Sequence, residues 1–148
     1  MLTQQQADNL LQAAKTLINC THINFPKPGD SLTLEAETST GNDSFLLDIN
    51  RKGKISLSKC TLQNRHMRTI ILLRVDLVGP PHTNPDLQEI PCPHIHIYRE
   101  DYMDKWAYPL PEIMPTNISD LGQVLLDFLK YNNITNVPLI TYQGGGLV

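Results

Sequence analysis

The sequence predicts an α+β domain, in which a mostly antiparallel sheet of four to six strands carries an N-terminal and a C-terminal helix packed on it. Three observations lead to this prediction. Apolar residues recur at helical spacing near both ends of the chain, the segments between them alternate apolar and polar residues, and turn residues join these segments closely. With 148 residues and 41% hydrophobic content, we expect one domain over residues 1–143 and a flexible tail over residues 144–148.

The two helices follow from the spacing of their apolar residues. Thr3 and Gln6 form a capping-box pattern, and the apolar residues that follow predict a helix over residues 3–19. A second helix is expected over residues 119–131, where apolar residues again line one side. Each helix therefore has one face that can cover a sheet.

The strands are expected between the two helices. Most of these segments alternate in polarity, whereas the nearly continuous apolar run at residues 70–78 is typical of a strand buried on both faces, which we expect at the centre of the sheet. Residues 64–68 are expected to be a polar link. The predicted strands are residues 32–36, 44–50, 55–58, 70–78, 92–100, 106–110 and 137–142.

A row of metal-binding and proton-transfer side chains occurs in residues 90–100. Alternate residues of a strand point to opposite faces, so Ile95 and Ile97 are expected in the core. The opposite face should carry Cys92, His94, His96, Tyr98 and Glu100. Two histidines at i and i+2 stand about 6–7 Å apart along a strand, close enough to bind one ion.

We therefore predict that His94 and His96 bind a transition metal, and zinc is the metal that we expect. Cys92 and His82 are the further ligands expected, with Cys60 in reserve. Zinc accepts mixed sulfur and nitrogen ligands better than Mg²⁺ or Ca²⁺ does. Three same-face positions span about 13 Å of strand, so these residues need not all converge. The alternative is that both histidines are polar residues on the solvated side of a sheet.

Two charged residues, Arg74 and Asp76, interrupt the apolar run at residues 70–78 and share one face of that strand. An unpaired buried charge is costly, so we expect these two residues to be paired or to line a site. A mutual or cross-strand ion pair and a catalytic role both remain open.

If the protein is a nuclease, its catalytic residues are expected among His94, His96, Arg74, Tyr98 and Glu100. One histidine would act as general base, and an arginine, Arg74 or Arg99, would stabilise the charge of the phosphorane. Tyr98 or Glu100 would be the partner acid. The protein would then be a His- and Arg-dependent ribonuclease or nuclease toxin.

The composition restricts the environment and the partners. The net charge of −3 disfavours an extended surface for nucleic acid, although a local basic cluster occurs between residues 51 and 68. The N-terminal residues lack the features of a signal peptide, and no apolar stretch is long enough to cross a membrane, so we expect a cytoplasmic protein. Cys20, Cys60 and Cys92 are then expected to be reduced.

Four segments, residues 45–51, 79–85, 91–100 and 104–110, carry a further signal, including the motif Pro-Cys-Pro-His-x-His-x-Tyr-Arg-Glu. Together they resemble an uncharacterised family of small bacterial proteins of prophages and other mobile elements, over about residues 1–133. The resemblance implies no settled function. A mobile-element setting implies either a toxin or an inhibitor of host defence, such as an anti-CRISPR protein.

From these observations we expect a small zinc-binding protein that inhibits a host defence nuclease, such as a CRISPR effector, by direct protein binding. An acidic protein suits association with a basic nucleic-acid-binding groove. The acidic residues expected to make that contact are Asp86, Glu89, Glu100, Asp101 and Asp104. The alternative is a ribonuclease or nuclease toxin of a toxin–antitoxin system. The identity of the partner and the oligomeric state stay open.

Overall fold

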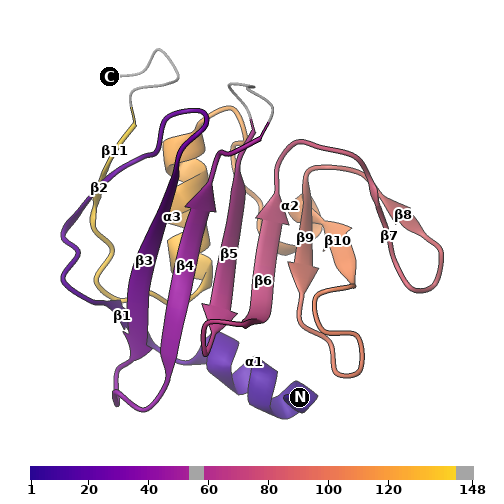
Figure 1. Ribbon diagram of the computed structural model, residues 1–148, viewed down its shortest axis with the longest axis horizontal. Helices are drawn as coiled ribbons and strands as arrows, with labels where there is room; N and C mark the ends of the chain where they lie inside the picture. Colours follow the sequence, from indigo (N-terminus) through magenta and orange to yellow (C-terminus); the bar gives the residue numbers. More distant parts are fainter. Residues whose placement is uncertain (54–58, 143–148) are drawn as a thin grey trace.

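The computed structural model describes residues 1–53 and 59–142. Its main element is a seven-stranded sheet with the order β1-β3-β4-β5-β6-β9-β10, in which all neighbouring strands are antiparallel (Figure 1). The strands are β1 (Lys15–Leu17), β3 (Ser31–Thr38), β4 (Ser44–Asn50), β5 (Thr61–His66), β6 (Ile70–Asp76), β9 (His94–Ile97) and β10 (Ala107–Pro109). The predicted α+β class is confirmed, with seven strands in the main sheet where four to six were expected.

Two small sheets accompany the main one. β2 (His22–Asn24) pairs in parallel with β11 (Leu139–Thr141), which lies within the predicted C-terminal edge strand. β7 (His82–Thr83) and β8 (Glu89–Ile90) form an antiparallel hairpin. Figure 1 shows this hairpin at the edge of the molecule where β9 and β10 lie. The hairpin therefore brings His82 to the histidine-bearing side of the sheet.

Helix α3 (Leu121–Tyr131) covers one face of the sheet and lies behind it in Figure 1. The side chain of Asp120 begins the helix, because it accepts a hydrogen bond from the Gln123 N–H at 3.1 Å. The side chains that α3 buries are Leu121, Val124, Leu125, Phe128 and Leu129. A short helix, α2 (Leu110–Ile113), follows β10 directly.

Helix α1 (Gln4–Gln12) lies across one end of the sheet (Figure 1). The predicted capping box is present: the Thr3 hydroxyl accepts from the Gln6 N–H at 3.1 Å, and Gln6 Oε1 accepts from the Thr3 N–H at 2.9 Å. The predicted helix end at residue 19 is wrong, because Lys15–Leu17 forms strand β1 on the edge of β3. The Lys15 ammonium binds the carbonyl oxygens of Leu11 and Ala13, each at 2.9 Å, and so closes the helix end.

The polar link predicted at residues 64–68 is also largely wrong, because β5 (Thr61–His66) is the middle strand of the sheet. Its inward residues are Leu62, Asn64 and His66. Two of these buried residues are polar, so the sequence of β5 does not show the alternation of apolar and polar residues that predicts a strand. The run at residues 70–78 contains β6, an interior strand next to the middle one. The strand predicted at residues 55–58 and the tail at 144–148 lie outside the described residues.

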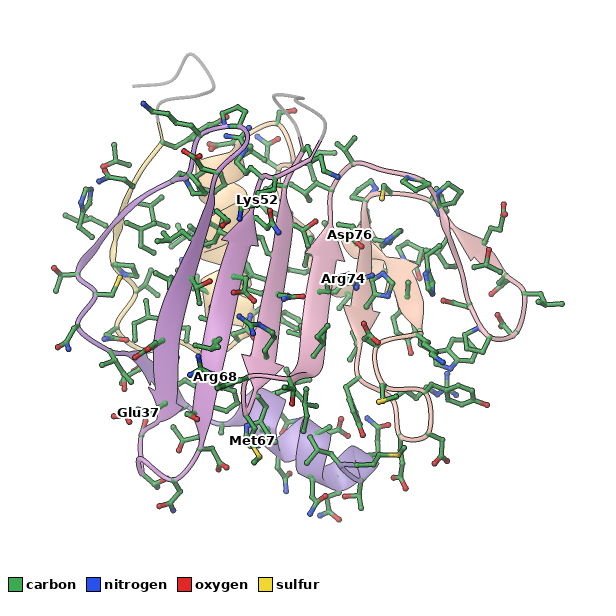
Figure 2. The ribbon with its side chains drawn as sticks, in the orientation of Figure 1. Glu37, Lys52, Met67, Arg68, Arg74 and Asp76 are labelled. Atoms are coloured by element: carbon green, nitrogen blue, oxygen red, sulfur yellow. The ribbon has the colours of Figure 1, made fainter. Side chains whose placement is uncertain are left out.

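The two faces of the sheet differ in chemistry. One face is apolar and packs against α3; it includes Leu34, Leu47, Leu62, Val75 and Ile95. On the other face, Thr33, Asp48, Gln63, Arg74 and His96 are cross-strand neighbours in a single row. Figure 2 shows Arg74 and Asp76 on β6, on the face that α3 does not cover. The candidate site lies at the β6–β9 end of this polar face.

Candidate metal centre

The two histidines of β9 face two charged residues of β6. The strands pair so that Asp76 is opposite His94 and Arg74 is opposite His96. The Oδ2 atom of Asp76 lies 3.1 Å from His94 Nε2 and 3.3 Å from His96 Nε2. The candidate ligand atoms of Asp76, His94 and His96 all lie within 4.8 Å of one another. The chain therefore contains a possible metal-binding group of two imidazoles and one carboxylate.

Both histidines are buried, with exposed fractions of 2% for His94 and 1% for His96. The alternative of two half-buried polar residues on the solvated side of a sheet does not match this burial. Backbone carbonyls hold both rings: His94 Nδ1 is 3.0 Å from the Ile90 oxygen, and His96 Nδ1 is 2.8 Å from the Asp104 oxygen. The segments before β9 and before β10 thus enclose the histidines from two sides.

These carbonyls determine which nitrogen of each ring carries the proton. A carbonyl oxygen can only accept, so Nδ1 of His94 and Nδ1 of His96 must be the donors. In a neutral ring the other nitrogen, Nε2, then carries a lone pair. Both Nε2 lone pairs approach Asp76 Oδ2, which is also an acceptor. Three acceptor atoms therefore converge, and the positive group beside them is the Arg74 guanidinium, whose Nη2 lies 3.1 Å from His96 Nε2.

The Asp76 side chain is present as a carboxylate. Burial alone would raise the pKa of Asp76, but the neighbouring His96 side chain, the charge of Arg74 and a hydrogen bond from Thr61 together hold that pKa well below its ordinary value. The Thr61 hydroxyl donates to Oδ1 at 3.1 Å. The carboxylate therefore faces the two histidines with one oxygen and is oriented through the other.

Arg74 is the positive group that faces these acceptors. Its guanidinium lies 3.3 Å from Asp76 Oδ2 through Nε, 3.1 Å from His96 Nε2 through Nη2 and 3.4 Å from Asp104 Oδ2 through Nη1. The predicted ion pair between Arg74 and Asp76 is therefore present, and the same arginine also borders the metal-binding group. The ion-pair interpretation is confirmed, and the catalytic role stays a prediction.

The structure places His82 beside the group. The centroid of its ring lies 4.5 Å from that of His96 and 6.1 Å from that of His94. His82 Nε2 is 2.7 Å from the Lys105 carbonyl oxygen, so Nε2 carries the proton and Nδ1 is the unprotonated nitrogen of the neutral ring. Among the described residues, His82 is not a member of the close ligand group.

The predicted cysteine ligands lie outside the group as well. Cys92 Sγ is 3.6 Å from His94 Nδ1 and 4.0 Å from His94 Nε2, and among the described residues it is not a member of the close ligand group. Burial and then the Asp76 charge raise the pKa of the Cys92 thiol. Cys60 packs in the core, where burial raises its pKa to about 12. Both side chains are therefore thiols in this structure.

The structure does not bring Tyr98, Arg99 or Glu100 to the histidines. Tyr98 packs in the hydrophobic core and donates its hydroxyl to the Leu2 carbonyl at 2.7 Å. Glu100 accepts from the Gln4 N–H at 2.7 Å, at the start of α1. Since β9 ends at Ile97, the strand alternation that predicted a shared face stops there. Arg99 stacks on the Trp106 ring at 4.3 Å from its centroid.

Residues 2–134 match the family of unknown function DUF6978. The chain belongs to this family. No match was found among curated proteins, and none was found among solved structures. Among the described residues, no helix is long and apolar enough to cross a membrane. The family assignment agrees with the predicted resemblance to an uncharacterised family.

A pocket of about 270 Å³ opens beside the metal-binding group. The residues that line it are Lys59, Thr61, Arg74, Asp76, Val78, Gly79, Pro80, Pro81, His82, Cys92, His94 and His96. Two larger hollows, of about 580 and 560 Å³, lie elsewhere. Neither has converging ligand atoms among its described lining residues, whereas the smaller pocket of this DUF6978 protein adjoins the possible metal-binding group.

Sequence reasoning missed Asp76 as a ligand, although it singled the residue out. The available signal was a carboxylate in an otherwise apolar strand, with an arginine two positions before it on the same face. What the sequence does not show is the β6–β9 register that sets Asp76 opposite His94. His94 and His96 were found because their convergence depends only on local strand geometry.

Proposed function

We propose that this protein is a zinc-dependent hydrolase that cleaves phosphodiester bonds, that is, a metal-dependent nuclease. The observation that carries the proposal is the convergence of three acceptor atoms, Asp76 Oδ2, His94 Nε2 and His96 Nε2, within 4.8 Å of one another. All three come from paired strands, so the site is rigid. Two histidines and one carboxylate form a ligand set that zinc uses in catalytic sites.

The open pocket favours a catalytic centre over a structural one. Structural zinc sites use four protein ligands, whereas catalytic sites keep one position for water or substrate. Three ligand atoms converge here, and the adjoining pocket of about 270 Å³ provides room for the fourth partner. Zinc in this position would lower the pKa of a bound water to about 7 and supply hydroxide as the nucleophile.

The surrounding residues supply the remaining roles of the hydrolysis. His82, through its unprotonated Nδ1, takes the proton of the attacking water. In the hydrolysis the oxygen of water would form a new bond to phosphorus, the bond to the leaving oxygen would break, and the proton held by His82 would pass to that oxygen. Arg74, which borders the ligand atoms, stabilises the negative charge on the transferring phosphoryl group.

Metal content and cleavage test this proposal together. Protein purified without chelator is expected to contain close to one equivalent of zinc and to cut RNA or DNA oligonucleotides, and both properties should be lost in Asp76→Ala and His94→Ala. His22→Ala is the matched control, because His22 is an exposed histidine on β2. Less than a tenth of an equivalent of metal would reject the zinc centre. Full zinc occupancy without cleavage of any nucleic acid would reject the nuclease.

A second candidate function is inhibition of a host defence nuclease, such as a CRISPR effector, by direct binding. The observation that favours it is the exposure of Asp86, Glu89 and Asp101. They lie on the β7–β8 hairpin and the loop after β9, which share one edge of the molecule in Figure 1. The other two expected contact residues are partly engaged, Glu100 with α1 and Asp104 with Arg74. In this function a metal at Asp76, His94 and His96 would join β6 to β9 and do no chemistry.

Binding to candidate defence nucleases distinguishes the two functions. An inhibitor should co-elute with its target nuclease, lose affinity as salt is raised, and lose it further in the charge-reversal variant Asp86→Lys with Glu89→Lys. Cleavage of RNA by the protein alone, without capture of any nuclease, would favour the toxin. Location of the gene in prophages or other mobile elements is expected under both functions.

A further inference from the structure

We propose that the pocket beside the metal centre is a binding site for a phosphate group, and that metal binding releases Arg74 to bind it. This inference rests on the metal centre of the proposed function. Two positive side chains, Lys59 and Arg74, and the Thr61 hydroxyl line the pocket together with the metal-binding group. A phosphate oxygen in this pocket would meet hydrogen-bond donors on one side and the metal on the other.

Arg74 is held only loosely by its acidic neighbours. Its contacts to Asp76 and Asp104 measure 3.3 and 3.4 Å, longer than the 2.7–2.9 Å usual for charge-assisted hydrogen bonds. Arg65, on the same face of the sheet, binds Asp48 through two bonds of 2.6 and 2.8 Å. Arg65 is thus fixed by a bidentate pair, whereas Arg74 divides its donors among three residues.

A metal ion and Arg74 compete for the same lone pairs. Arg74 Nη2 lies 3.1 Å from His96 Nε2, and Arg74 Nε lies 3.3 Å from Asp76 Oδ2. A metal bound by these two atoms takes the electron pairs that now accept from the guanidinium, and its positive charge repels Arg74. Arg74 therefore loses two of its three partners on metal binding and keeps Asp104, which leaves donors free to face the pocket.

Phosphate is the ligand class that fits these released donors. The guanidinium presents its N–H groups in a fork that matches two phosphate oxygens, and Lys59 adds a point charge. An anion placed between the metal and Arg74 also offsets the repulsion between the two cations. Metal and phosphate should therefore bind with positive coupling, which means that each raises the affinity for the other.

Cobalt(II) in place of zinc allows both metal binding and phosphate binding to be measured. Its absorption in the visible range reports metal binding, and its unpaired electrons accelerate the ³¹P relaxation of inorganic phosphate bound close to it. We expect phosphate to bind at least tenfold more tightly to the cobalt-loaded protein than to the metal-free protein. Arg74→Met should lower the phosphate affinity of the loaded protein about tenfold, Lys59→Met should lower it less, and Arg74→Lys should restore part of it.

Arg68→Met is the control, since Arg68 is an exposed arginine that Figure 2 places away from Arg74 and Asp76. It should leave phosphate binding unchanged. If cobalt binds but phosphate affinity is the same with and without it, or if both Arg74→Met and Lys59→Met bind phosphate as the unchanged protein does, the phosphate site is wrong while the metal centre stands. If cobalt does not bind, the proposed metal centre fails together with this inference. Circular dichroism of each variant verifies folding, and Lys59→Met decides the test if Arg74→Met does not fold.

Discussion

Two clusters of buried polar groups in this domain solve the same physical problem in opposite ways. One surrounds Lys15, whose exposed fraction is 0%, on the apolar side of the sheet, and the other is the metal-binding group on the polar side. The three N–H donors of Lys15 Nζ meet three backbone carbonyls, of Leu11, Ala13 and Asn132, each at 2.9 Å. The cluster around Lys15 thus has an acceptor for every donor of its charge.

The metal-binding group has the reverse balance. Asp76, His94 and His96 direct acceptor atoms toward one another, and Arg74 is the cation that faces them. Burial makes both clusters costly unless their charges are compensated. Three carbonyl acceptors surround the Lys15 ammonium, although burial still lowers the pKa of Lys15 to about 8. The cluster around Asp76 instead brings three acceptor side chains together beside one guanidinium, and this difference makes it the candidate for metal binding.

The largest expected effect on stability comes from the cluster around Lys15. Lys15→Met keeps the length of the side chain but removes three hydrogen bonds and leaves buried carbonyls without a donor. We expect the free energy of unfolding to fall by about 3 kcal/mol, measured by urea denaturation, because hydrogen bonds to charged groups are worth about 1.5–3 kcal/mol each and are not additive. Lys130→Met is the control, because Lys130 is exposed in the last turn of α3, and it should change stability by less than about 0.5 kcal/mol. Equal effects of the two substitutions would contradict a structural role for Lys15.

The next effect separates the two clusters by their response to metal. Zinc at about one hundred times its dissociation constant should raise the free energy of unfolding by about 2.7 kcal/mol, because it binds only the folded protein. Asp76→Ala should abolish this increase, measured as the shift of the urea midpoint with zinc. Lys130→Met should retain it in full. A zinc-induced increase that survives in Asp76→Ala would place the metal elsewhere on the chain.

Local geometry decided which parts of this structure the sequence could predict. The strands that became β3 and β4 were predicted because their residues alternate in polarity and turn residues, including Gly41, lie between them. In the structure Gly41 adopts a positive φ of +77°, which glycine tolerates best. The centre of the sheet was missed because Asn64 fills a core position in β5, where its amide binds Asn132 at 2.8 Å. The true end of α1 likewise depends on Lys15, whose third acceptor is the distant Asn132 carbonyl. No local pattern contains these long-range partners.

The difference between local patterns and long-range contacts also explains which residues of the candidate site the sequence predicted. The spacing of His94 and His96 is local, so their shared face follows from strand geometry. The pairing of β6 with β9, which adds Asp76, and the β7–β8 hairpin, which brings His82 close, are contacts across the sheet. Cys92 and Tyr98 share the parity of the histidines but lie beyond the ends of β9, where the alternation no longer holds.

A smaller effect is expected from the other arginine–aspartate pair on the polar face. Burial alone would raise the pKa of Asp48, but hydrogen bonds from Arg65, Gln63 and Thr33 hold it below its ordinary value of 3.8. A lowered pKa means that the carboxylate stabilises the fold above that value and that the contribution is lost as the pH falls through the folded-state pKa. Asp48→Asn should therefore cost about 1 kcal/mol at pH 7, and the difference from the unchanged protein should shrink progressively below about pH 4, measured by urea denaturation across pH. A difference that stays constant down to pH 2 would show that the charge of Asp48 does not contribute.

The smallest effect is expected at Cys92, and it tests where the metal-binding group ends. Cys92 Sγ lies nearest to His94 Nδ1, at 3.6 Å, which is the nitrogen that donates to the Ile90 carbonyl and not the one that faces Asp76. The thiol lies 4.0 Å from His94 Nε2 and, among the described residues, is not one of the three converging ligands. Cys92→Ser should therefore change the zinc dissociation constant by less than about threefold. His96→Ala should raise that constant at least about a hundredfold, because it removes one of the three residues that bind the metal directly. Zinc titration against a competing chelator measures both. A hundredfold loss in Cys92→Ser would mean that the thiol enters the coordination shell when metal binds, as the sequence alone predicted, and that the loop before β9 rearranges to bring it there.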